Sequence, residues 1–204
     1  LNGEDCIPDE ETTKKKSICT SRSFNGMIED FESLRTHVSN FAVRCAEKLR
    51  CQNTVASVVA VFIQTNSFRE DLKQYSNFLE QRLLTPSSST ITIVETATEV
   101  LKKLYRPGYK YKKAGVVVMG IGPNSPIQQD LFDYNAEQFE KMKRLDAVID
   151  HINKVNGTET VVLGSQQYTR KDGKGKADVF ANSIKHDFRS SNPTTRWSDI
   201  IRLK

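Results

Sequence analysis

The stretch Val55-Ala56-Ser57-Val58-Val59-Ala60-Val61-Phe62-Ile63-Gln64-Thr65 decides the fold of this 204-residue chain. It is rich in β-branched residues, which favour the extended backbone of a strand. Its almost unbroken apolar character predicts a strand that is buried inside a sheet. Asn53 precedes this strand and breaks a helix that starts after Asp30, whose carboxylate can accept the free amides of the first turn. One apolar stripe with steps of three and four residues runs along that helix: Phe31, Leu34, Val38, Phe41, Cys45 and Leu49.

Three further strands are predicted on either side of this pair. Ser17 to Phe24 forms a short first strand. Gln74 to Leu84 forms a third strand, which is more polar and therefore nearer to an edge or an open face, and Pro86 ends it. Tyr109 to Ile121 forms the fourth.

A second amphipathic helix lies between the third and fourth strands. It begins near Ser88 and stops before Pro107, because proline cannot continue the helical hydrogen bonds. The predicted class is thus α+β, with the order β-α-β-β-α-β. Two helices can cover only one face of a four-stranded sheet, so the other face stays open for a ligand.

Composition divides the chain into four segments. Residues 1–15 are polar and charged and contain Pro8, which indicates a linker. Residues 16–122 hold the sheet and its helices, and residues 123–134 form a loop that begins within the glycine- and proline-rich stretch Gly120 to Pro126. Residues 135–204 form a small mixed helix and strand region. The first residue is not methionine, so we expect a C-terminal piece of a longer protein.

The last segment has a helix signature at its start. Asn135 and Gln138 match a capping box, and Asn156-Gly157 is a stop signal. Thr160 to Gly164 is predicted as a short strand. The remainder is polar, with Trp197 among its few apolar anchors, so this segment has too little apolar content for a core of its own.

The net charge of +5, from 30 Lys+Arg against 25 Asp+Glu, is a mild basic excess that does not by itself prove nucleic-acid binding. The cysteines show no paired spacing, so we expect reduced thiols in a cytoplasmic protein, with Cys19 and Cys45 in the core. No run approaches the ~18 apolar residues of a membrane span, so no membrane partner is expected. The cysteines are Cys6, Cys19, Cys45 and Cys51.

The basic residues cluster near predicted strands, where they suggest contacts to a nucleic-acid backbone. Ala114-Gly115 follows two lysines, and small residues there would let a phosphate approach the backbone amides. The alternatives are a solvated edge with lysines that prevent aggregation and, for Arg82, a cross-strand ion pair beside Glu80. The candidate DNA-binding residues are Arg22, Ser23, Arg82, Lys110, Lys112 and Lys113.

A second candidate site is the peptide Gln128-Gln129-Asp130-Leu131-Phe132, which lies in the loop after the fourth strand. Two apolar anchors inside a polar peptide are typical of a binding hot spot, and the glutamine amide would fix its register. The alternative is a helix lead-in in which Leu131 and Phe132 cap the core.

The sequence shows no catalytic constellation. His37, His151 and His186 lie far apart without metal-ligand spacing. We find no carboxylate pair on a strand end that could hold two metal ions, no phosphate-binding glycine loop and no nucleophile elbow. These observations favour a binding module without a cofactor.

Several of these stretches, in this order, resemble the C-terminal part of Y-family DNA polymerases of the UmuC type. Lys16 to Phe24 is similar to the first strand of their little finger domain, and Leu83-Leu84-Thr85-Pro86 and Tyr109 to Val118 are similar to later strands. Thr194 to Lys204 is similar to the end of these proteins.

The resemblance implies a function for each segment. Residues 16–122 would be the little finger, lying in the major groove of damaged primer-template DNA, and residues 135–204 the UmuC-type C-terminal domain. Residues 123–134 would carry a sliding-clamp-binding motif, which departs from the family pattern at Gln129, where leucine is common. A UmuD-like protein and RecA would be partners in SOS mutagenesis.

The resemblance also implies what this chain lacks. The catalytic palm with its Mg²⁺ ions would lie upstream of residues 1–15, so this chain alone is expected not to polymerise DNA. The rival interpretation is a stand-alone α/β module that binds RNA or protein. An RNA-binding sheet usually carries aromatic residues on its central strands, and Val116-Val117-Val118 in the fourth strand argues against it.

Overall fold

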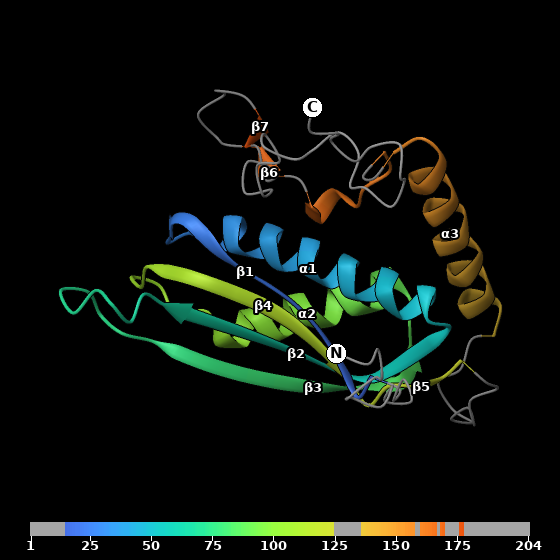
Figure 1. The fold of residues 1–204 in the computed structure, drawn as a ribbon, viewed down its shortest axis with the longest axis horizontal. Helices are drawn as coiled ribbons and strands as arrows, with labels where there is room; N and C mark the ends of the chain where they lie inside the picture. Colours follow the sequence, from blue (N-terminus) through green and yellow to red (C-terminus); the bar gives the residue numbers. More distant parts are fainter. Residues whose placement is uncertain (1–14, 125–135, 158–159, 167, 170–175, 178–204) are drawn as a thin grey trace, which may run out of the picture.

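The computed structural model describes residues 15–124, 136–157, 160–166, 168–169 and 176–177, and side chains within 15–124, 139–157 and 160–166. The first part of the chain has the predicted order of strands and helices (Figure 1). Its elements are β1 (Ser17–Ile28), α1 (Phe31–Cys51), β2 (Thr54–Thr65), β3 (Ser76–Ser87), α2 (Thr90–Leu104) and β4 (Tyr111–Met119). The later elements are β5 (Gly122–Pro123), α3 (Ala136–Val155), the 3-10 helix η1 (Gly164–Gln166), β6 (Tyr168–Thr169) and β7 (Lys176–Ala177).

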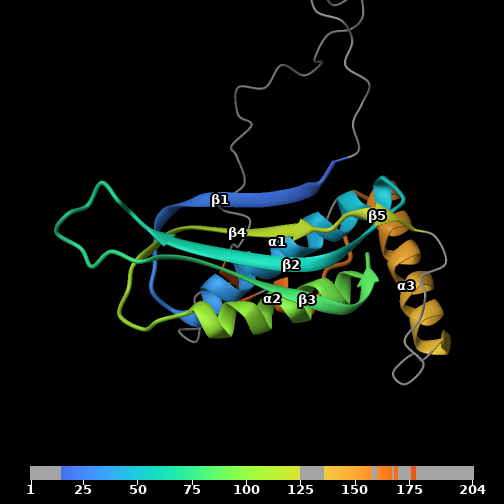
Figure 2. The same cartoon turned by 90° about the horizontal axis from the view of Figure 1, so that it is seen from below.

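The four long strands form an antiparallel sheet in the order β1-β4-β2-β3. Helix α1 packs on β1, β4 and β2, while α2 packs on β2 and β3, so both helices cover the same face (Figure 2). The short strand β5 pairs with the first residues of β2. The predicted α+β class, with two helices on one face of a four-stranded sheet, is confirmed.

Alternation along the strands builds the core. Val59, Val61 and Ile63 of β2 point toward the helices and are fully buried. They meet the apolar stripe of α1, including Cys45, where burial raises the pKa of the thiol. Cys19 is exposed, so its predicted place in the core is wrong.

The ends of α1 follow the predicted capping chemistry. The Asp30 carboxylate accepts a hydrogen bond from the Ser33 amide at 2.7 Å. Asn53 has φ +50°, in the left-handed region that asparagine tolerates, and turns the chain into β2.

Two expectations at the strand level are corrected. β3 continues through Pro86 to Ser87, because it is an edge strand, where a proline without an amide hydrogen is tolerated. Thr160 to Gly164 is not a strand. The Asn153 side chain binds both the amide and the carbonyl of Val161, at 2.8 and 3.1 Å, and these groups are therefore lost to sheet pairing.

Within the described ranges, no helix is both long and apolar enough to span a membrane.

Candidate nucleic-acid interface

The face of the sheet opposite the helices carries no helix among the described residues, and its side chains form a regular grid. Strand register places four side chains in each row, from β1 across β4 and β2 to β3. The rows are Ser17-Met119-Val58-Arg82, Cys19-Val117-Ala60-Glu80, Ser21-Gly115-Phe62-Phe78 and Ser23-Lys113-Gln64-Ser76. We call this surface the open face.

Two of the predicted DNA-binding residues, Ser23 and Lys113, lie directly opposite each other on the open face. The Lys113 ammonium lies over the ring of Phe62, 5.9 Å from its centroid. The nearby outward positions of β1 carry small side chains, and three of them are serines: Ser17, Ser21 and Ser23. This edge of the open face therefore combines a cation with short side chains.

Lys112 does not share the position of Lys113. The pairing of β4 with β2 shifts between Lys113 and Tyr111, which places a bulge at Lys112. The Lys112 ammonium donates hydrogen bonds to the carbonyls of Phe24 and Asn25, at 2.6 and 3.3 Å. It holds the irregular part of β1 between Ser23 and Ile28, and it is only partly exposed.

Arg22 and Lys110 also depart from the predicted arrangement. Arg22 shares its strand face with the buried residues Ile18 and Phe24, and its charge helps to lower the pKa of His37 on α1. It therefore lies on the helical side of the sheet and not on the open face, and its contact with DNA stays a prediction. Lys110 precedes β4 and pairs with Glu29 at 3.1 Å.

Arg82 is exposed on the open face of β3, at the end of the grid opposite to Lys113. Glu80, two residues away, is exposed on the same face. No ion pair of Arg82 occurs among the residues that the structure describes, so the alternative of a cross-strand pair has no support there.

Two aromatic residues on the open face were missed by the sequence analysis. Phe62 of the central strand β2 lies opposite Phe78 of β3, and Phe78 is 49% exposed. A Cβ atom at Gly115 would stand 2.5 Å from the Phe62 ring and from the Ser21 side chain. Glycine is therefore required at position 115, because the ring crosses β4 there. Strict alternation along β2 is the signal that could have identified Phe62, since Val61 and Ile63 point inward.

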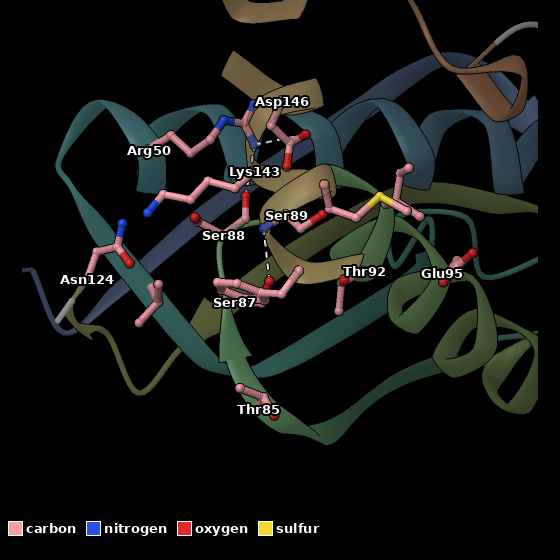
Figure 3. Close-up of a pocket in the computed structure, with 14 residues that line it drawn as sticks. Arg50, Thr85, Ser87, Ser88, Ser89, Thr92, Glu95, Asn124, Lys143 and Asp146 are labelled. Atoms are coloured by element: carbon pink, nitrogen blue, oxygen red, sulfur yellow. Dashed lines mark hydrogen bonds and ion pairs between the residues drawn. The ribbon is translucent and has the colours of Figure 1, made fainter. Parts of the chain in front are cut away.

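The predicted clamp-binding peptide, Gln128 to Phe132, lies outside the described residues. The chain before it is anchored, because the Asn124 amide donates to the Asn53 carbonyl at 3.2 Å. A cavity of about 330 Å³ lies beside this point, between the ends of β3 and α1, the start of α2, and α3 (Figure 3).

Arg50, near the end of α1, connects three helices at this cavity. Its guanidinium donates two hydrogen bonds to Asp150 of α3, at 2.6 and 2.7 Å, and two to Ser88 and Thr90 at the start of α2, both at 2.8 Å. Asp146 lies 3.7 Å from the same guanidinium (Figure 3). Burial alone would lower the pKa of Arg50, but these carboxylates raise it above its ordinary value.

Asp146 also caps α2. Its two carboxylate oxygens accept the Thr90 amide at 3.3 Å each, whereas the Ser89 side chain at the N-cap position makes no capping bond. A helix N-terminus favours a negative charge. We call Arg50, Asp146 and Asp150 the latch, since they fasten α3 to the end of the helical layer.

Among the described residues, no group of three or more His, Cys, Asp or Glu side chains could hold a metal ion.

Comparisons with known proteins match both parts of the chain. Residues 15–131 match the model of the impB/mucB/samB family C-terminal domain, and residues 143–203 match a domain of unknown function (DUF4113). The first match ends within the predicted clamp-binding peptide, and the second begins inside α3.

Curated relatives align over nearly the whole chain. It is 33% identical to the protein UmuC of Salmonella typhimurium, over 100% of this chain and 46% of that protein. It is 32% identical to SamB of Salmonella typhimurium, over 100% of this chain and 46% of SamB. It is 31% identical to MucB of Escherichia coli, over 98% of this chain and 44% of MucB. The chain thus spans less than half the length of these relatives, and it belongs to the impB/mucB/samB family, as the C-terminal part of such a protein.

Proposed function

We propose that this chain is the non-catalytic C-terminal part of an error-prone Y-family translesion DNA polymerase, and that its open face grips damaged primer-template DNA. Family membership supports the polymerase assignment. The observation that carries the DNA-binding role is the uncovered row with Ser23 beside Lys113, at an edge lined by small serines.

This geometry suits contacts to a phosphate backbone. A lysine supplies charge, and short hydroxyl side chains let the sugar-phosphate chain come close to the sheet and donate hydrogen bonds to its oxygens. Such contacts fix position without specifying sequence, which is what an enzyme that works at any lesion needs. Within the set of predicted residues, Lys113, Ser23 and Arg82 are the ones that reach the open face, so they are the proposed contacts.

The peptide Gln128 to Phe132 is proposed to tether the polymerase to the sliding clamp. The support is its sequence, with an apolar pair inside a polar peptide. A weak tether raises the local concentration of the enzyme at the primer end, so micromolar affinity is sufficient. A UmuD-like protein and RecA in the SOS response, and a cytoplasmic location, are proposed from the family alone.

The nucleotidyl transfer step is assigned to a palm domain outside this chain. The Mg²⁺ ions of the reaction would be held by carboxylates there. This chain would position the DNA and the clamp, and would show no incorporation of nucleotides by itself.

The test of DNA binding is the salt dependence of affinity for a primer-template duplex, measured by fluorescence anisotropy. Lys113→Gln should weaken binding to every sequence alike and reduce the slope of log K against log salt by about 0.9, as expected for one lost phosphate contact. The matched control is Lys102→Gln, which removes the same charge from the exposed side of α2. Equal effects of the two substitutions would reject the open face as the binding surface.

The tether has its own test. Calorimetric titration with a bacterial sliding clamp should give micromolar binding, and Leu131→Ala/Phe132→Ala should abolish it. Retained binding by the double variant would place the clamp contact elsewhere.

A further inference from the structure

We propose that Phe78 and Phe62 form a platform on which an unpaired nucleotide of the DNA stacks. This inference rests on the proposed DNA-binding role and adds a second mode of contact to it. Phosphate contacts explain the row of the open face that holds Lys113, but they give no reason for two aromatic side chains in the neighbouring row.

The first argument is position. Phe62 and Phe78 are directly paired across β2 and β3, which brings their Cβ atoms to within about 5.5 Å of each other. Phe78 is 49% exposed, although a phenylalanine on a sheet normally turns toward the core. The pairing places two aromatic side chains in one row of the open face, and single-stranded nucleic-acid binders present aromatic residues to bases in a similar way.

The second argument is the space around the rings. Gly115 and Ser21 complete the same row, and neither projects a large side chain. The Phe62 ring therefore lies across β4 over Gly115, beside Ser21, and a planar group can lie on top of it. In a paired duplex the base faces are stacked on each other, so a ring on the protein can reach a base face only where a nucleotide is unpaired.

The third argument is charge. Lys113 lies in the next row and holds its ammonium near the Phe62 ring. The phosphate next to a base stacked on the rings would lie close to the Lys113 ammonium. On the opposite side of the platform Glu80 occupies the row of Ala60 and Val117, where it repels phosphate. These two charges predict that the backbone of the stacked nucleotide runs along the row of Lys113, whereas Arg82, in the row beyond Glu80, would contact a separate part of the DNA.

A protein ligand is the competing occupant of an exposed apolar surface. The charges argue against it, because the two rings are bounded by the Lys113 ammonium on one side and the Glu80 carboxylate on the other. If the occupant is a protein, the affinity of the chain for nucleic acid will be independent of Phe78.

The test measures binding of the full chain to a short oligo-dT and to a blunt duplex of the same length, by anisotropy at fixed salt. Phe78→Ser should weaken oligo-dT binding roughly 5- to 150-fold, which is the range for losing one base-aromatic stack. Binding to the blunt duplex should change less than twofold. Phe78→Trp should retain oligo-dT binding, because it keeps a ring, and Glu80→Gln should strengthen it.

The matched control is Leu84→Ser, which removes an apolar side chain that is 92% exposed and lies on the same strand. If Phe78→Ser and Leu84→Ser behave alike, or if Phe78→Ser leaves oligo-dT binding intact while Lys113→Gln weakens duplex binding, the platform is refuted and the phosphate contacts stand. If the unmodified chain binds neither probe, the proposed DNA-binding role fails, and the platform fails with it.

Discussion

Replacing Arg50 by methionine should destabilise the fold far more than breaking an equally well-formed ion pair at the surface. The Arg50 side chain is 16% exposed and that of Asp146 only 7%, while Asp150 is 36% exposed. Removing one partner of a buried pair costs about 3–5 kcal/mol, since the remaining charge stays buried without compensation. Asp150 can rehydrate, so we expect a loss of about 3 kcal/mol, at the lower end of this range.

The chain also contains an exposed ion pair that serves as the control. Arg69 and Asp71 form a bidentate pair with both hydrogen bonds at 2.7 Å, but their side chains are 49% and 58% exposed. Arg69→Met should leave the urea midpoint essentially unchanged, because solvent screens an exposed pair.

Equilibrium urea unfolding and thermal melting measure both variants. For a chain of this size, 3 kcal/mol corresponds to a fall of about 6–12 °C in Tm. Similar losses for Arg50→Met and Arg69→Met would refute the reasoning. Both arginines form a bidentate pair with similar hydrogen-bond distances, but Arg50 is largely buried and also bonds Ser88 and Thr90.

Three further outcomes are expected. Gly115→Ala should destabilise the fold by about 1–3 kcal/mol in urea unfolding through its clash with Phe62; Gly122→Ala, which meets no atom within 4 Å, should not. His37, whose pKa burial and Arg22 lower from 6.5 to about 4, should make stability fall as the pH drops. The unfolded chain binds a proton between pH 6.5 and 4 that the folded chain does not, so the contribution is complete above 6.5 and up to roughly 3 kcal/mol is lost toward pH 4; a His37→Gln variant with the same pH profile would contradict this. Asp30→Ala should cost about 1 kcal/mol by thermal melting, and an unchanged Tm would show that the cap is dispensable.

Local patterns predicted the elements that local physics controls. Helix α1 could be predicted from its apolar stripe and its cap at Asp30, and β2 from its β-branched residues. Neither prediction depends on distant contacts. Pro86 was misjudged, because its tolerance depends on β3 being at the sheet edge, which is a property of the assembled sheet. The inward direction of Arg22 was available from the sequence, since Ile18 and Phe24 have the same parity along β1.

Other features could not be predicted from local patterns. The bulge at Lys112 inserts one residue into β4, and it separates two lysines that look equivalent in the sequence. The capping of α2 by Asp146 joins residues that are 56 positions apart, so no spacing near Ser89 reveals it. Both features come from tertiary contacts that override local preference.

The latch and the open face lie on different sides of the sheet, and this separation leads to a last prediction. Arg50 and Asp146 lie where α1 ends and α2 begins (Figure 3), and Asp150 bonds the same guanidinium. Lys113 projects from the face that no described helix covers. Docking of α3 therefore does not compete with a ligand on the grid. Arg50→Met should lower the urea midpoint yet leave duplex affinity and its salt slope unchanged at temperatures where the variant is folded. A loss of duplex affinity in Arg50→Met comparable to that in Lys113→Gln would show that α3 itself contributes to the DNA contact, and the open face alone would then be an incomplete account of binding.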